Sequence, residues 1–276
     1  MFTKPVTTLS LILIPAFGLW ATALAGLSGS ISIGGNGPEL PTIERLARAF
    51  EKENPGTFVD IQWDQYQDPI RMVKSRLADV AVSGRTDPTL ASIPIAWDGI
   101  AVVVYIANPT KEVTMQQVAA IFSGQVRRWT ELSGYETAIQ LIDRPANQDI
   151  RRSFEEALSI VGQIPPYAQV TRSDQAAMST VAGSVSAVAY ASLRPALEAV
   201  KYGVDVSLLM IDHVEAAEET VKDGRYKLRR PVLLLSRNEP NPVTEAFAAF
   251  ARSKEGQEIV AELFTPYQPL RQVEIK

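Results

Sequence analysis

A long uncharged apolar stretch dominates the hydropathy pattern of the chain. Residues 100–107 are rich in Val and Ile, and the run is bounded by Asp98-Gly99 and Asn108-Pro109. Such a continuous run is typical of a strand buried on both faces, whereas a surface helix shows an interrupted stripe with a period of 3.6 residues. We predict that this run, within the stretch of residues 93–108, forms a strand that leaves one lobe and enters a second, beside a cleft. A plain core strand is the alternative.

The rest of the chain alternates between strand and helix patterns, which predicts the α/β class. Short apolar or alternating stretches predict strands at residues 30–33, 58–63, 79–85, 139–142, 187–191, 206–211 and 229–236. Amphipathic stretches predict helices at residues 39–53, 68–77, 114–122, after Asn147 or Asp149, and at 244–264 with a break near Ser253.

The uncharged strand at 229–236 could carry the chain back into the first lobe. The sequence shows no internal repeat and no Pro- or Ser-rich linker, which fits a second lobe inserted between two crossing strands. We therefore predict a first lobe made of residues 26–105 and 229–276, and a second lobe made of residues 106–228.

The first 25 residues have the pattern of a secretory signal peptide. Lys4 provides a positive start, residues 9–19 form a short apolar core, and Ala23-Leu24-Ala25 is a small-x-small cleavage site. The apolar core is too short to span a bilayer comfortably, although an uncleaved anchor is the alternative. With no cysteine to carry a lipid after the signal, we predict a free periplasmic protein.

Composition argues against several functional classes. The net charge of −4 argues against a nucleic-acid surface, which requires a basic footprint. The lack of cysteine excludes disulfides, thiol catalysis and thiolate metal sites. His213 is the single histidine, and no nucleophile motif accompanies it, so we expect no enzyme, no metal and no cofactor.

Candidate ligand-binding residues follow the ends of three predicted strands, where ligands bind in open α/β sheets. Asn36-Gly37-Pro38 lies in a Gly-rich turn before a helix, where backbone N–H groups can hold an anion. Ser83, Gly84 and Arg85 follow a second strand, and Arg144 stands between a third strand and a helix. A guanidinium there could grip an oxyanion with two parallel hydrogen bonds. Plain turn chemistry, or a salt bridge of Arg144 with Asp143 or Asp149, is the alternative.

Several spaced motifs together resemble the phosphate-type solute-binding proteins of ABC importers, which have the type II periplasmic binding fold. The motifs occur in the family's order and cover nearly all of the chain after residue 25. They are the runs DGIAVVV at 98–104, QQVAAIFSG at 116–124, WTEL at 129–132, AVAYASL at 187–193, RPVLL at 230–234 and SKEGQEIV at 253–260.

The resemblance implies two α/β lobes that enclose a tetrahedral oxyanion, with no cofactor. By position, the family's first anion loop corresponds to Asn36-Gly37-Pro38, its serine to Ser83 and a nearby arginine to Arg85. Its second arginine corresponds to Arg144, and its Gly-Ser-Gly-Thr turn to Asn147-Gln148-Asp149-Ile150.

The anion loops depart from the family pattern. Pro38 has no backbone N–H, the turn has lost two glycines and two hydroxyls, and Asp149 adds a negative charge. At ~4 Å and an effective dielectric of ~20, that charge opposes an anion by about 4 kcal/mol per unit charge. An aspartate could instead accept a proton from a protonated oxyanion.

We expect a monomeric exported protein that captures a small oxyanion, phosphate first, between its lobes and meets an ABC importer permease. Two alternatives stay open. One is the same fold binding a different small solute. The other is a periplasmic interaction or sensory protein that imports nothing.

Overall fold

The computed structural model describes residues 26–64, 66–132 and 134–267. The predicted signal peptide, residues 1–25, lies outside the described residues. Within these ranges, none of the helices has the length and hydropathy that a membrane crossing requires.

Strands and short helices alternate along the chain. In order, the elements are β1 (Ser28–Gly35), α1 (Leu40–Glu53), β2 (Gly56–Trp63), α2 (Pro69–Lys74), β3 (Val80–Ser83), β4 (Ala91–Tyr105), β5 (Glu112–Val113), α3 (Met115–Phe122), the 3-10 helix η1 (Trp129–Leu132), β6 (Gln140–Asp143), α4 (Asp149–Ala157), β7 (Gln169–Val170), α5 (Asp174–Ala182), β8 (Ala187–Ser192), α6 (Leu193–Lys201), β9 (Val206–Leu208), β10 (Met210–Ile211), α7 (Glu218–Lys222), β11 (Arg229–Ser236), α8 (Pro242–Arg252), α9 (Lys254–Val260) and β12 (Thr265–Pro266).

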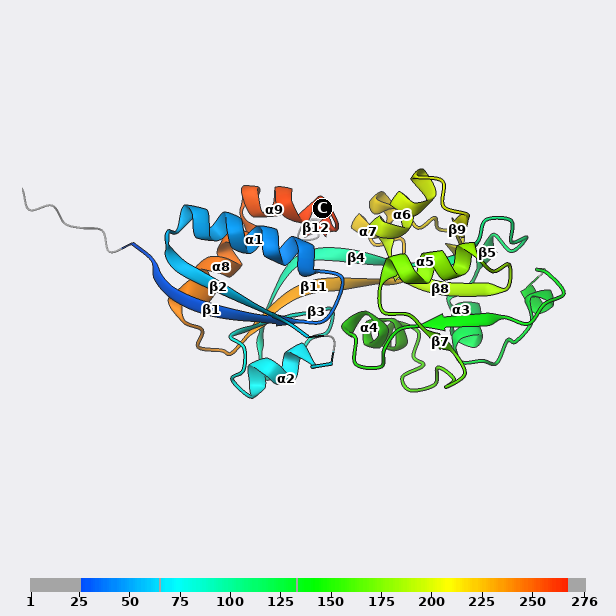
Figure 1. Cartoon of the computed structure of the whole chain (residues 1–276), viewed down its shortest axis with the longest axis horizontal. Coiled ribbons are helices and arrows are strands. Elements are labelled where there is room, and N and C mark those ends of the chain that lie inside the picture. The colour runs from blue at the N-terminus through cyan, green and yellow to red at the C-terminus, as the bar shows by residue number, and fades with distance from the viewer. Residues whose placement is uncertain (1–25, 65, 133, 268–276) are drawn as a thin grey trace, which may run out of the picture.

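One sheet runs through the molecule in the order β2-β1-β3-β11-β4-β8-β6-β7, with β9 and β12 also paired to β4. The strands β1, β2 and β3 are parallel, and β11 pairs antiparallel with both β3 and β4. Beyond this, β4 pairs with β8, and β8 continues to β6. Figure 1 shows the consequence: β4 and β11 run between two halves that lie side by side along the long axis.

Two hydrophobic cores lie on either side of these crossing strands. The first contains Ile95, Ala96 and Val232 together with the buried faces of β1, α1 and α8. The second begins at Ile100 on β4 and ends at Leu228, just before β11. We call the parts built on them the first and the second lobe. The core therefore changes between Ala96 and Ile100 on one strand and between Leu228 and Val232 on the other.

The long apolar strand and its return are confirmed. From Ile100 to Val104 every side chain of β4 is fully buried, because the strand is covered on both faces. The break near Ser253 is also confirmed, since the Ser253 hydroxyl accepts a hydrogen bond from the Gly256 N–H at 3.1 Å and starts α9. The exact lobe boundaries at residues 105 and 229 stay a prediction.

Two local predictions are corrected. The strand predicted at 206–211 is two strands, because Leu209 N–H bonds to Val102 O at 2.9 Å and Met210 then pairs with β5 instead. The helix predicted after Asn147 or Asp149 is α4, but its N-cap is Gln148, and that side chain makes no capping bond. Asp149 lies in the first turn, and its carboxylate is used elsewhere.

Candidate functional site

The predicted site residues come together where the two lobes meet. The chain leaves β1 at Asn36 and β3 at Gly84 on the first lobe, and it enters α4 at Asp149 on the second. The Asn36 amide joins the lobes directly. Its Nδ2 donates to Asn147 O at 2.8 Å, and its Oδ1 accepts from the Asp149 N–H at 3.1 Å.

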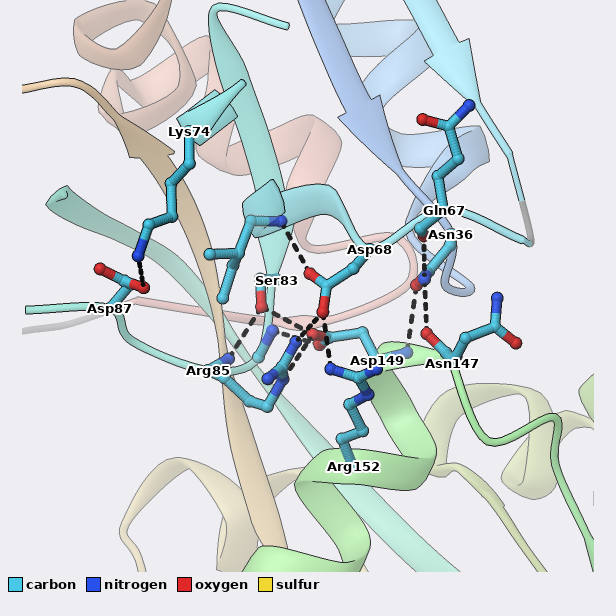
Figure 2. Close-up of polar contacts among 12 residues, drawn as sticks. Asn36, Gln67, Asp68, Lys74, Ser83, Arg85, Asp87, Asn147, Asp149 and Arg152 are labelled. Atoms are coloured by element: carbon cyan, nitrogen blue, oxygen red, sulfur yellow. Dashed lines mark hydrogen bonds and ion pairs between the residues drawn. The ribbon is translucent and has the colours of Figure 1, made fainter. Parts of the chain in front are cut away.

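Asp149 points its carboxylate away from its own helix and into the end of β3 (Figure 2). Its Oδ1 accepts hydrogen bonds from Ser83 Oγ at 2.6 Å and from Arg85 Nε at 3.2 Å. Its Oδ2 accepts a short hydrogen bond from the Gly84 N–H and another from Arg230 Nη1 at 3.1 Å. Only 1% of Asp149 is exposed. Groups predicted to bind an external anion therefore bind this carboxylate.

Arg230 stands at the centre of the buried charges. It lies on β11 opposite Asp98 on β4, at the point where both strands pass between the lobes. It donates to Asp98 Oδ2 from Nε at 3.1 Å and from Nη2 at 2.9 Å, and it also bonds to Glu39 and to Asp149. One buried guanidinium thus faces three buried carboxylates. We call Glu39, Asp98, Asp149 and Arg230, with Ser83, Gly84 and Arg85, the Asp149 cluster.

The buried charges shift each other's ionisation. Burial raises the pKa of Glu39 to about 7, against the opposing attraction of Arg230, and Asp149 pushes it the same way as burial. Burial also raises the pKa of Asp98, although Arg230 and the Ser192 hydroxyl oppose that shift. Burial disfavours the charged form of Arg230, but the three carboxylates outweigh it and raise its pKa. A further negative charge in this cluster would therefore be disfavoured.

Asp68 is contacted by two arginines, one from each lobe. Asp68, at the start of α2, accepts from Arg152 Nη1 on α4 at 2.6 Å, and it lies 3.4 Å from Arg85 Nη2. Figure 2 shows Arg152 reaching from the second turn of α4 towards Asp68. Arg152–Asp68 is thus a further ion pair between the lobes, beside those of Asp149 with Arg85 and Arg230.

A cavity of about 370 Å³ opens on the other side of Asn36, between the lobes. Arg144 lines it and forms a short ion pair with Asp174 at the start of α5. Only 3% of Arg144 is exposed, and its Nε has no hydrogen-bond partner among the described residues. We call this space the Arg144 cavity; its lining is Asn36, Gly37, Pro38, Leu40, Pro41, Trp63, Arg144, Gln148, Ile150, Arg172, Ser173 and Asp174.

Trp63 forms one wall of the Arg144 cavity and is held in place by two neighbours. Its Nε1 donates to Gly37 O at 3.0 Å, and its ring lies against Gly35, its partner in the β1–β2 register. A Cβ at Gly35 would overlap the ring. The wall therefore depends on a glycine at this position.

Replacing Gly35 with alanine is expected to displace the Trp63 ring and to lower the free energy of unfolding by about 1–3 kcal/mol, the usual range for overpacking. Tryptophan fluorescence and urea unfolding measure the two effects. Gly183→Ala is the matched control, because a Cβ there meets its nearest atom at 3.6 Å, an ordinary contact. An unchanged emission spectrum in Gly35→Ala would contradict the expected displacement.

The structure divides the predicted site residues into two groups. Ser83, Gly84 and Arg85 gather around Asp149, whereas Gly37, Pro38, Arg144, Gln148 and Ile150 line the Arg144 cavity, with Asn36 between the groups. The alternative prediction, a salt bridge of Arg144 with Asp143 or Asp149, is wrong about the partner. Its partner is Asp174, while Asp143 is bound by Arg151 and by the Tyr190 hydroxyl.

Sequence reasoning missed Arg230, Glu39, Asp98 and Trp63 as site residues. A signal existed for two of them: Asp98 and Arg230 are charged residues at the margins of the uncharged apolar runs of the two crossing strands. A charge in such a place is expected to need a buried partner. Nothing in the sequence spacing pairs Glu39 with Arg230, which are 191 positions apart.

Comparisons with known proteins agree with this architecture. The curated "Phosphate-binding protein PstS 2" of Streptococcus pneumoniae is 35% identical over 111 residues, which span 38% of each chain. A structure described as a candidate phosphate ABC transporter substrate-binding protein with bound phosphate, from Clostridium perfringens, is 26% identical with a TM-score of 0.75 and covers 87% of this chain and all of its own. An ABC-type phosphate transport receptor from Vibrio cholerae is 25% identical, with a TM-score of 0.77 and the same coverage.

These similarities confirm the two-lobe type II periplasmic binding fold and the resemblance to phosphate-type solute-binding proteins. The family model described as "PBP superfamily domain" matches residues 21–255. The chain therefore belongs to the PBP superfamily domain family.

Proposed function

We propose that the protein is a solute-binding protein that captures a small anion between its lobes, phosphate first, for an ABC importer. The observation that carries this proposal is the Arg144 cavity, which has a buried arginine with an unsatisfied Nε and walls from both lobes. The names of the related proteins supply phosphate as the first candidate. The protein would carry out no chemistry, and specificity would come from a few polar groups in the cleft.

The chemistry of the cavity suits an anion. Arg144 is paired with Asp174, so this pair adds no net charge, but Arg172 at the rim is a further cation. Ser173 and Asp174 begin α5, a nine-residue helix whose N–H groups favour a negative ligand. Gln148 bonds to Arg172 O at 3.2 Å and keeps that loop in position. Arg144 and Arg172 are therefore the expected anion contacts.

Export to the periplasm, release of the signal peptide, a monomeric state and contact with an importer permease belong to the same proposal. In that setting, the solute would lie between the closed lobes, and the closed surface would meet the membrane partner. The second candidate is an interaction or sensory protein that imports nothing. It is favoured by one observation: the donors at the end of β3 are occupied by Asp149.

Replacing Arg144 with alanine is expected to weaken phosphate binding by about tenfold or more, because a charge-assisted bond to the anion is lost. Isothermal titration calorimetry against phosphate, sulfate and a panel of small organic anions measures the affinities. Arg45→Ala is the control, since Arg45 pairs with Glu262 on the exposed surface of the first lobe. Equal affinities for Arg144→Ala and the unchanged protein would refute this role of Arg144. Silence across the whole panel would favour the interaction protein.

A further inference from the structure

We propose that Asp149 is an internal ligand. Its carboxylate takes the place of an oxyanion at the end of β3, holds the two lobes together without added solute, and so determines specificity by excluding free phosphate from that end of the cleft. This inference goes beyond the proposed function, because it concerns the protein before any solute binds.

The Asp149 carboxylate is bound as a captured anion would be. An ionised carboxylate offers about four lone-pair positions, two on each oxygen. Oδ1 accepts from the Ser83 hydroxyl and the Arg85 guanidinium, and Oδ2 accepts from the Gly84 N–H and from Arg230. These donors are a hydroxyl, a backbone N–H and two guanidinium groups, the set expected around an oxyanion. With each oxygen accepting two bonds, Asp149 occupies these four donor groups.

The donors and the acceptor come from different lobes. Ser83, Gly84 and Arg85 follow β3 in the first lobe, and Arg230 lies on the crossing strand β11. Asp149 belongs to α4, whose neighbours Ile150 and Phe154 pack in the second core. A binding protein of this architecture closes when a solute bridges the lobes. In this chain a side chain of the second lobe supplies that bridge.

The surrounding charges oppose an added anion. Arg230 already serves Glu39, Asp98 and Asp149, so phosphate entering beside it would face three carboxylates. Displacing Asp149 would break four hydrogen bonds of a buried carboxylate and leave it to find other partners. An external solute is therefore left with the Arg144 cavity, on the other side of Asn36.

Further bonds hold α4 in this position without a solute. Asn36 bonds to the Asp149 N–H and to Asn147 O, and Arg152 pairs with Asp68. These contacts place the first turn of α4 against the first lobe. Removing the Asp149 carboxylate should shift the equilibrium towards an open form, because the most buried of the bridging interactions is lost.

The test compares Asp149→Gly, which places the related family's turn residue at this position, and Asp149→Asn with the unchanged protein. Small-angle X-ray scattering gives the radius of gyration with and without millimolar phosphate, and calorimetry gives the phosphate affinity. Asp149→Asn keeps the shape of the side chain if the glycine variant folds poorly. Asp223→Asn is the matched control, because Asp223 is an exposed aspartate that bonds to Arg225 at the end of α7.

We expect the unchanged protein and Asp223→Asn to be compact, with a radius of gyration that phosphate does not change. Asp149→Gly should be larger without phosphate, contract when phosphate is added, and bind phosphate about tenfold or more tightly, because the like charge is gone. Asp149→Asn should change in the same direction. The proposal is overturned if the folded Asp149 variants keep the unchanged protein's radius of gyration, or its phosphate affinity.

The two proposals fail separately. If the unchanged protein binds no anion but the Asp149 variants open and bind phosphate, the proposed capture of phosphate by the unchanged protein is refuted and the internal ligand stands. If Arg144→Ala loses phosphate binding while the Asp149 variants behave as the unchanged protein does, the capture of phosphate stands and the internal ligand is refuted.

Discussion

Replacing Arg230 with methionine is expected to lower the free energy of unfolding by about 3–5 kcal/mol, the usual effect of removing one partner from a buried ion pair. Arg230 is 2% exposed and bonds to Glu39, Asp98 and Asp149. Methionine keeps much of the side-chain length but none of the charge. Asp98 would retain the Ser192 hydroxyl, and Asp149 would retain Arg85, whereas Glu39 would lose its arginine.

Urea unfolding near neutral pH measures this loss of stability. Arg45→Met is the matched control, since it also removes an arginine from an ion pair, but one whose two side chains are about half exposed. Exposed pairs contribute about 0–1 kcal/mol. The interpretation fails if Arg230→Met and Arg45→Met destabilise the protein equally. It also predicts that acidic pH reduces the defect, because protonated carboxyl groups no longer need the missing charge.

The stability of the protein is expected to fall by about 3 kcal/mol as the pH rises from about 4.5 to about 7, through the ionisation of Glu39 alone. Burial raises the pKa of Glu39 from 4.5 to about 7 in the folded protein. Below pH 4.5 the carboxyl group is protonated in both states. Between the two pKa values only the folded state keeps the proton, so rising pH favours unfolding. The full loss is reached above the folded pKa.

The difference in unfolding free energy between the unchanged protein and Glu39→Gln isolates this contribution, because other titrating groups are common to both. As the pH rises from 4.5 to 8, the Gln variant should become more stable relative to the unchanged protein. Glu245→Gln, on the exposed face of α8, should show no such shift. A difference that stays constant across this range would show that Glu39 ionises with an ordinary pKa.

The fold could be predicted wherever the hydrophobic pattern of an element's own residues determines its structure. The uncharged runs in β4 and β11 required burial on both faces, and their separation along the chain implied an inserted second lobe. The amphipathic face of α1, with Ile43, Leu46 and Phe50 buried, followed from helical periodicity. The prediction failed at 206–211, because the division into β9 and β10 depends on which neighbouring strand each half meets.

The candidate site was predictable as a set of residues but not as an arrangement. Strand ends pointed to Asn36, Ser83 and Arg144, because the ends of parallel strands lie at one edge of a sheet. The sequence also indicated that the negative charge of Asp149 would oppose a bound anion. The partners of Asp149 could not be predicted from the sequence, because Ser83 and Arg230 are 66 and 81 positions away from it.

The sequence by itself determined the two lobes, the crossing strands and the edge of the sheet where polar groups gather, because burial and periodicity are local properties of a chain. Only the tertiary structure decided what those polar groups bind. A carboxylate and an arginine form an ion pair only when they lie close together, and their separation is set by the packing of α4 against the end of β3. There the second lobe presents Asp149 to donors that the sequence had assigned to an external anion.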